Sequence, residues 1–298
     1  MSRTPATGRE NLIGSLFMIL SMAGFAIEDS FIKYATLTDR QIPHGQLIVM
    51  VAASGMVFFG AMTAFRRQPL FPAELLSKPL LIRGGFEIMG RLSYTLAFIL
   101  APLITATAIL QATPLVVVAG AALFLGEKVG PRQWAAVVLG FFGVMLILRP
   151  WGAQFDFLTI LAVLGMIGFA GRDLATRASP ARLSNWQLGF IGYTMFTLAG
   201  LIIWGLQGGF TQISGAAMTY ITIAAMGGIT GYFALTVAMR TGDVGAVTPW
   251  RYTRLIIGAI LVLIMFGEPI DLPTIIGSVI VVGSGIFTMI RRRQRQQT

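Results

Sequence analysis

Arginine side chains lie deep inside apolar segments of this chain, next to acidic and aromatic residues. Arg83, Glu87 and Arg91 are spaced by four residues, so on a helix they share one face, and Tyr94 follows one turn later. One carboxylate cannot neutralise two guanidinium groups. Two interpretations stay open: Glu87 forms a structural ion pair, or Arg91 and Glu87 contact a charged ligand.

A second arginine pair lies in the run Trp250-Arg251-Tyr252-Thr253-Arg254. Arg251 and Arg254 are three residues apart and share a helical face. Guanidinium groups between aromatic rings can bind a carboxylate or phosphate in bidentate fashion and can stack on a ring. We expect both to bind substrate, Arg254 more than Arg251. The alternative is pairing with acidic residues of other segments, namely Glu28, Glu87 and Asp173.

Part of this pattern occurs twice. The phrase at 24–29, Gly-Phe-Ala-Ile-Glu-Asp, returns 144 residues later at 168–173 as Gly-Phe-Ala-Gly-Arg-Asp. Two further matches keep the same order: Gly90 and Tyr94 return as Gly228 and Tyr232, and Gly126-Glu127 returns as Gly267-Glu268. The chain is therefore predicted to be a duplicated unit, with halves at 1–150 and 151–298. Because Phe25 recurs as Phe169, we expect both to serve packing.

The repeat separates shared charges from unshared ones. Asp29 and Lys33 are one helical turn apart and recur as Asp173 and Arg177, which predicts structural ion pairs in both halves. Glu28 has no acidic counterpart, because Arg172 occupies the equivalent position. A buried glutamate can exchange a proton at membrane depth. Glu28 is therefore the first candidate for a proton-coupling residue, and Glu87 is the second.

The composition excludes a soluble protein. Hydrophobic residues make up 55% of the chain, charged residues 11%, and mean hydropathy is +0.78, whereas soluble domains carry about 25% charged residues. The chain has no cysteine and a single histidine, His44, which leaves no basis for a multi-histidine metal site. Nucleic-acid binding is not expected despite the +10 charge, since basic residues flank apolar segments.

The elements that must position these residues are membrane-spanning helices of ~20 residues. We expect ten spans, at 11–36, 42–65, 79–99, 101–124, 131–149, 156–176, 186–207, 215–239, 244–266 and 270–290. Pro114 is expected to kink the fourth. Lys and Arg outside the spans concentrate on the side of both termini, which are therefore expected to be cytoplasmic. Five spans per half would invert the second half relative to the first.

The chain resembles the drug/metabolite transporter superfamily, in its ten-span EamA-type branch. The resemblance is carried by the repeated phrase, by Gly-Glu before spans 5 and 10, and by the run Ile109-Leu110-Gln111-Ala112-Thr113-Pro114. It implies an all-α membrane fold of two inverted five-helix repeats, a central cavity, alternating access and transport of small metabolites. Leu255 stands where the first half has Pro114, so the halves are not chemically equal.

The charges at membrane depth suggest the substrate class. Six basic residues face four acidic ones, and the surplus favours an anionic or zwitterionic ligand. The candidate cavity residues beyond the arginines are Tyr94, Trp250, Gln111, Thr113, Tyr193, Tyr232 and Tyr252, of which we expect Tyr94, Trp250 and Gln111 to contact substrate.

The sequence favours a secondary transporter of the bacterial inner membrane, without a cofactor and with a possible coupling proton or other ion. A P-loop is absent, which argues against direct drive by ATP. The alternatives are an intramembrane lipid carrier and a lipid-modifying enzyme.

Overall fold

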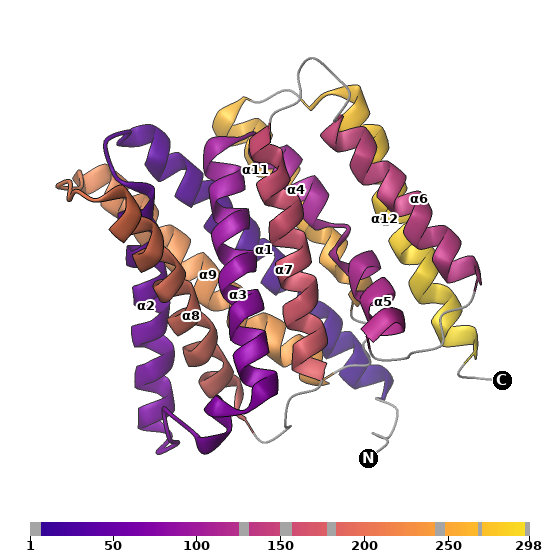
Figure 1. The fold of residues 1–298 in the computed structure, drawn as a ribbon, viewed down its shortest axis with the longest axis horizontal. Coiled ribbons are helices and arrows are strands. Elements are labelled where there is room, and N and C mark those ends of the chain that lie inside the picture. Colours follow the sequence, from indigo (N-terminus) through magenta and orange to yellow (C-terminus); the bar gives the residue numbers. More distant parts are fainter. Residues whose placement is uncertain are drawn as a thin grey trace.

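The computed structural model describes residues 7–124, 131–149, 157–177, 183–241, 248–267 and 270–295, and within these ranges the regular elements are all helical (Figure 1). The α-helices are α1 (Gly8–Thr38), α2 (His44–Phe65), α3 (Lys78–Leu100), α4 (Leu103–Leu110), α5 (Thr113–Phe124), α6 (Pro131–Leu148), α7 (Ile160–Arg177), α8 (Asn185–Gln207), α9 (Gly215–Thr241), α11 (Thr253–Phe266) and α12 (Leu272–Arg295). Three short 3₁₀ helices are η1 (Ala73–Leu76), η2 (Phe157–Thr159) and η3 (Thr248–Tyr252).

Two long helices start with the same local device. At α1, Thr7 Oγ1 accepts from the backbone N–H of Glu10, whose side chain accepts from the N–H of Thr7. Ser184 and Gln187 repeat this arrangement at the start of α8. Such capping boxes satisfy backbone donors that the first helical turn leaves without partners. Both starts are therefore encoded locally.

The prediction of a membrane fold is supported by helix length and composition. Among the described residues, four helices are long and apolar enough to cross a membrane: α1, α2, α8 and the Gly215–Ala238 part of α9. Shorter apolar stretches occur at Thr105–Val117, Val137–Ile147 and Leu272–Ser284. The count of ten spans stays a prediction.

One predicted span is interrupted, and another changes from 3₁₀ to α-helical geometry. The span at 101–124 consists of α4 and α5, separated by Gln111 and Ala112, and the span at 244–266 includes η3 before α11. Pro114 has no N–H to give to the carbonyl four residues back, and the Thr113 hydroxyl donates to that carbonyl, Leu110 O, instead. Pro114 thus accompanies a full break in the helix, where the sequence predicted a kink.

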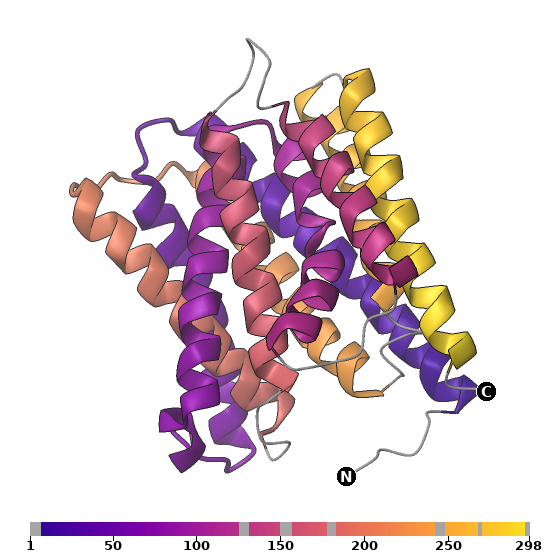
Figure 2. The same cartoon turned by 45° about the vertical axis from the view of Figure 1, so that its right-hand side comes forward.

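Helices from opposite halves of the sequence pack in pairs. α1 packs against α9, α3 against α7, α2 against α8, and α6 against α12. The α6–α12 pair lies along one edge of the bundle in both views (Figures 1 and 2). In these views the start of α1 and the end of α12 lie at the same end of the bundle.

The glycine of the repeated phrase permits two of these close contacts. A Cβ at Gly24 would lie 2.6 Å from the carbonyl oxygen of Gly227, where α1 meets α9. A Cβ at Gly168 would lie 2.5 Å from the Cα of Gly90, where α7 meets α3. Small residues let helix backbones approach this closely. The two halves therefore use the repeated glycine for equivalent contacts on each other's third long helix.

Candidate functional site

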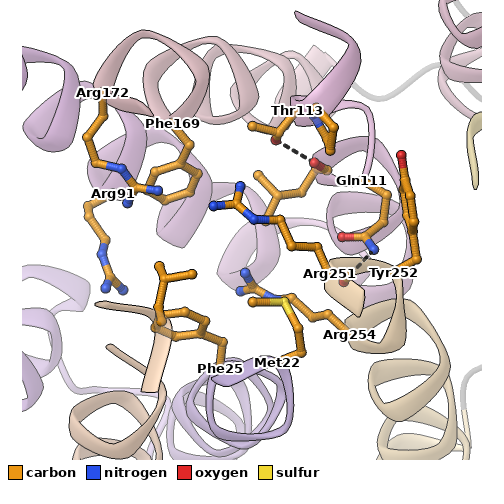
Figure 3. A pocket seen from close by; sticks show the side chains of 13 residues that line it. Met22, Phe25, Arg91, Gln111, Thr113, Phe169, Arg172, Arg251, Tyr252 and Arg254 are labelled. Atoms are coloured by element: carbon orange, nitrogen blue, oxygen red, sulfur yellow. Dashed lines mark hydrogen bonds between the residues drawn. The ribbon is translucent and has the colours of Figure 1, made fainter. Parts of the chain in front are cut away.

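A central pocket lies where the α4–α5 segment and the η3–α11 segment meet α1, α3, α7 and α9 (Figure 3). Its cavity volume is about 70 Å³. Four arginines line it, together with apolar and neutral polar side chains; they are Arg91, Arg172, Arg251 and Arg254. Among the described lining residues there is no acidic side chain. The wall therefore presents guanidinium groups to whatever enters.

The break between α4 and α5 is joined directly to the 3₁₀ helix η3 at this pocket. The Gln111 side-chain Nε2 donates to the backbone carbonyl of Arg251 at 3.1 Å. Gln111 belongs to the turn between α4 and α5, and Arg251 belongs to η3. In Figure 3 the side chains of Arg251 and Arg254 extend from this side of the pocket toward the side that carries Arg91 and Arg172. The Gln111 side chain thus connects the α4–α5 turn to η3, from which Arg251 reaches the pocket.

Arg91 and Arg172 are ion-paired with buried glutamates. Arg91 Nη1 lies 3.4 Å from Glu28 Oε2, and Arg91 Nε lies 3.5 Å from Glu87 Oε1. Arg172 Nη1 lies 3.4 Å from the same Glu87 oxygen. Glu28 and Glu87 are 1% and 0% exposed. Buried charges need such partners, because an unpaired ion at this depth is strongly unfavourable.

The two aspartates of the repeated phrase, Asp29 and Asp173, pair with Arg254 and Arg251. Asp173 Oδ2 accepts from Arg251 Nη1 at 3.0 Å, and Asp173 Oδ1 accepts from Arg172 Nη2 at 2.9 Å. Asp29 accepts from Arg254, and from the Tyr94 hydroxyl at 3.0 Å. Equivalent acids from α1 and α7 therefore anchor Arg254 and Arg251, which lie three residues apart.

The structural interpretation of the buried arginines is confirmed, because they are ion-paired. Four of them also line the pocket, and their contact with substrate stays a prediction. Arg83 lies 3.9 Å from Glu87 Oε2 and donates to the Tyr232 hydroxyl at 2.9 Å, but it is not among the described lining residues. The five arginines of the cluster face four carboxylates, which leaves a formal charge of +1. The surplus near the pocket is therefore smaller than the sequence count suggested, because Lys33 lies elsewhere.

Aromatic rings complete the arginine environment. The guanidinium carbon of Arg254 lies 5.3 Å from the centre of the Phe25 ring, and that of Arg172 lies 4.9 Å from the Phe169 ring. Such contacts stabilise a guanidinium group away from water. Phe25, Phe169 and Arg172 line the pocket, although the sequence indicated packing for the two rings and no binding role for Arg172. The position of these three residues in the repeated phrase was the sequence feature that could have indicated a place at the pocket.

The other predicted residues occupy different positions. Gln111, Thr113 and Tyr252 line the pocket. Tyr94 is buried behind it and lies 3.5 Å from Arg254, with its hydroxyl as the near atom. Trp250 is 43% exposed and is not among the described lining residues.

The predicted structural ion pairs within each half stay predictions. Asp29 contacts Arg254 and Tyr94, whereas Lys33 Nζ donates to the carbonyl of Ala101 at 3.2 Å. The side chain of Arg177 lies outside the described part of the structure. Across the described residues, no group of three or more His, Asp or Glu side chains is arranged to hold a metal ion.

Comparison with known proteins identifies the family. The sequence signature of the EamA-like transporter family matches the chain twice, over residues 12–149 and 156–290. A riboflavin transporter of Rhizobium johnstonii is 23% identical over 96% of this chain and 94% of its own. An S-adenosylmethionine uptake transporter of Rickettsia prowazekii is 27% identical over 69% of both chains.

A solved crystal structure shares the fold. It aligns with a TM-score of 0.61 over 96% of this chain and 97% of its own, at 20% sequence identity. The family members and named relatives are transporters, so the lipid-modifying enzyme considered from the sequence is not supported. The chain belongs to the EamA-like transporter family and is an integral membrane transporter.

Proposed function

We propose that this protein is a secondary transporter that binds a small anionic or zwitterionic metabolite in the central pocket. The observation that carries the proposal is the asymmetry of the pocket wall: four guanidinium groups line it, and their carboxylate partners are not among its described lining residues. A ligand with a carboxylate or phosphate can accept hydrogen bonds from these groups without displacing the whole network. A cationic ligand would meet like charge.

The chemistry of the pocket fits a metabolite, and its size indicates that it must widen to bind one. The cavity volume is about 70 Å³, below the roughly 300–1,000 Å³ of ordinary small-molecule sites. Its wall combines apolar side chains with the polar Gln111 and Thr113. The relatives are named for riboflavin and S-adenosylmethionine, both small organic metabolites with polar substituents.

The transport movement would be an exchange between two inverted five-helix halves, 1–150 and 151–298. This is supported by the reciprocal packing of α1 on α9 and of α7 on α3, and by the break between α4 and α5 that meets the 3₁₀ helix η3 of the second half at the pocket. Broken helices at a repeat interface near the midplane are typical of secondary transporters with inverted repeats. Rocking of the halves would open the pocket to one side and then to the other.

Coupling to a proton would run through Glu28 and Arg91. Glu28 is fully buried, and Arg91 lies between it and Glu87. An anionic substrate that approaches Arg91 competes with the Glu28 carboxylate for the same guanidinium group. Protonation of Glu28 would remove that competition, so a proton and an anion would travel together.

The membrane and orientation complete the proposal: an inner-membrane protein with both termini in the cytoplasm. It is supported by the excess of Lys and Arg on that side and by the start of α1 and the end of α12 at one end of the bundle.

A thermal-shift screen of the purified protein tests the substrate class. Ligands that bind the folded state raise the melting temperature by mass action. Carboxylates, phosphates and zwitterions should stabilise the protein, and the Arg254→Gln variant should lose the effect. Stabilisation by cations alone would show that the acidic residues face the ligand and would overturn the proposal.

A further inference from the structure

Tyr193 places a buried hydroxyl beside the carboxylate of Glu28. The tyrosine lies on α8 and is 1% exposed. A Cβ at Gly228 of α9 would lie 2.5 Å from Glu28 Oε1 and 2.7 Å from the Tyr193 hydroxyl oxygen, so the two oxygens are no farther apart than the sum of these two distances. Gly228 therefore leaves the space in which a carboxylate from α1 and a hydroxyl from α8 meet.

The Tyr193 hydroxyl has no hydrogen-bond partner among the residues that the structure describes. A tyrosine hydroxyl is both a donor and an acceptor, and a buried polar group without a partner is strongly disfavoured. Such a group in a native structure needs an explanation. One explanation is a partner that becomes available in another state of the protein.

The ring of Tyr193 is held in place by α2. It stacks on Phe59 with 5.5 Å between the ring centres, and a Cβ at Gly55 would lie 2.2 Å from its ring atoms. In a packed interior such a ring has little freedom to carry its hydroxyl elsewhere. Glu28 has the flexible side chain of the two, so a change of partner is a movement of the carboxylate.

Glu28 is held by fewer arginines than Glu87. Arg91 Nη1 lies 3.5 and 3.4 Å from the two Glu28 oxygens, farther than the ~2.7–2.9 Å of a strong charge-assisted hydrogen bond. Glu87 instead lies 3.4–3.9 Å from three guanidinium groups, those of Arg83, Arg91 and Arg172. An anion that draws Arg91 into the pocket would therefore deprive Glu28 of its ion pair, whereas Glu87 would keep two.

Arg91 apart, the charged or titratable groups around Glu28 and Tyr193 have other roles. They are Asp29 on α1, Glu87 on α3, Tyr232 on α9 and Arg254 on α11. The two acids, when ionised, are acceptors only. The Tyr232 hydroxyl accepts from Arg83 and donates to a backbone carbonyl of α8. Arg254 donates to Asp29 and lines the pocket, where the anion itself would bind. Tyr193 is therefore the donor that remains for Glu28 when Arg91 leaves.

We propose that Tyr193 is a positioning residue of the coupling site: its hydroxyl donates to the Glu28 carboxylate when an anion in the pocket engages Arg91. The inference rests on the proposed function, because it assigns a second partner to the proposed coupling residue. A donor stabilises the ionised carboxylate, so Tyr193 would set how far the pH must fall before Glu28 takes up the transported proton. Without the hydroxyl, Glu28 should take up its proton at a higher pH.

Infrared spectroscopy of the purified protein tests this relationship without a transported ligand. Arg91→Met removes the guanidinium group, as an anion would remove it from Glu28, and Arg91→Gln serves in its place if Arg91→Met does not fold. The carboxylic-acid C=O band of Glu28, identified by its loss when Glu28→Gln is added, is followed against pH. Adding Tyr193→Phe instead should raise the midpoint of this titration by about one pH unit or more, a roughly tenfold change in proton affinity.

Tyr252→Phe in the same background is the matched control. The Tyr252 hydroxyl is also buried and has no hydrogen-bond partner within the described part of the chain, but the charged group beside it is Arg251. This variant should leave the midpoint in place. A midpoint that Tyr193→Phe leaves unchanged or lowers would overturn the proposal, and so would an equal rise in the two variants.

The tyrosine gives a second readout, which decides the question if Glu28 stays ionised over the whole accessible pH range. The ring C–O stretching band of Tyr193, identified by its loss in Tyr193→Phe, should move to the position of a hydrogen-bond donor when Arg91→Met is introduced. A band that keeps its wild-type position would overturn the proposal. Neither readout needs anion binding, so a failure of anions to bind would remove the proposed function and leave the pairing of Tyr193 with Glu28 standing.

Discussion

The side chain of Gln111 donates to the backbone carbonyl of Arg251 at 3.1 Å and so joins the helix break of the first half to the 3₁₀ helix η3 of the second. Irregular backbone in a membrane must find its hydrogen-bond partners within the protein. This amide supplies one such bond between the two halves. We expect it to help hold Arg251 and Arg254 at the pocket.

Replacement of Gln111 by methionine should therefore affect binding as well as stability. The loss of one buried hydrogen bond costs about 1 kcal/mol, and the freed η3 segment should weaken anion binding. Gln46→Met is the matched control, because Gln46 Nε2 also donates to a backbone carbonyl across the halves, Thr211 O, away from the pocket. Both variants should lower the melting temperature, and only Gln111→Met should weaken binding in a titration. Equal binding by the two would contradict the role of the link.

The pair of Asp29 and Arg254 should behave as a coupled unit. Removing one partner of a buried pair leaves an uncompensated charge and costs about 3–5 kcal/mol. Arg254→Met and Asp29→Asn should each lower the melting temperature strongly, and the double variant should recover most of the loss. Anion binding should stay lost in the double variant, since its guanidinium group is gone. Binding restored along with stability would show that Arg254 is structural only.

Glu28→Gln tests the proposed coupling residue. The amide keeps the shape of the side chain but cannot take up a proton, and it competes less for Arg91. Anion binding should be retained or tightened, and the acceleration of uptake by an inward proton gradient should disappear. Glu10→Gln, at the exposed start of α1, is the control. Uptake that still follows the gradient in Glu28→Gln would exclude Glu28 as the coupling site.

Gly24→Ala should prevent correct packing of α1 on α9. The added Cβ would lie 2.6 Å from the backbone oxygen of Gly227, which cannot move aside without shifting a helix. Gly85→Ala in α3 is the control, because its Cβ would meet no atom within 4 Å, and alanine favours a helix by up to ~1 kcal/mol. Size-exclusion profiles and melting temperatures should separate the two. A well-folded, equally stable Gly24→Ala would contradict the close contact.

The sequence predicted the helices and the buried arginines better than the contacts between distant segments. Hydropathy indicated the long helices, and charges at helical spacing indicated the buried arginines. Two pairings were among the alternatives that the sequence offered, namely Glu87 with Arg91 and Asp173 with Arg251. The pairing of Asp29 with Arg254 was not, because these residues lie 225 positions apart and no periodicity connects them. Trp250 looked like a ring beside an arginine, yet the 3₁₀ geometry of η3 leaves it 43% exposed and brings Tyr252 to the pocket.

Phe25 and Phe169 pack in the hydrophobic core, as their repetition predicted, and they also line the pocket. A residue that recurs in both halves was expected to serve packing. Where two halves meet around one cavity, however, equivalent residues face the same space, and both rings line the pocket.

Uptake into proteoliposomes that contain the purified protein is the most direct test of the central claim. Wild-type protein should exchange radiolabelled carboxylates or zwitterionic metabolites across the membrane. Arg254→Gln and Arg91→Gln should each lose at least about 90% of that flux, as expected when a charge-assisted contact of more than ~1.4 kcal/mol is removed. Trp250→Phe should keep the flux of the wild type. Flux that is confined to cations, or that persists unchanged in both arginine variants, would contradict the assignment of the arginine-lined pocket as the transport site.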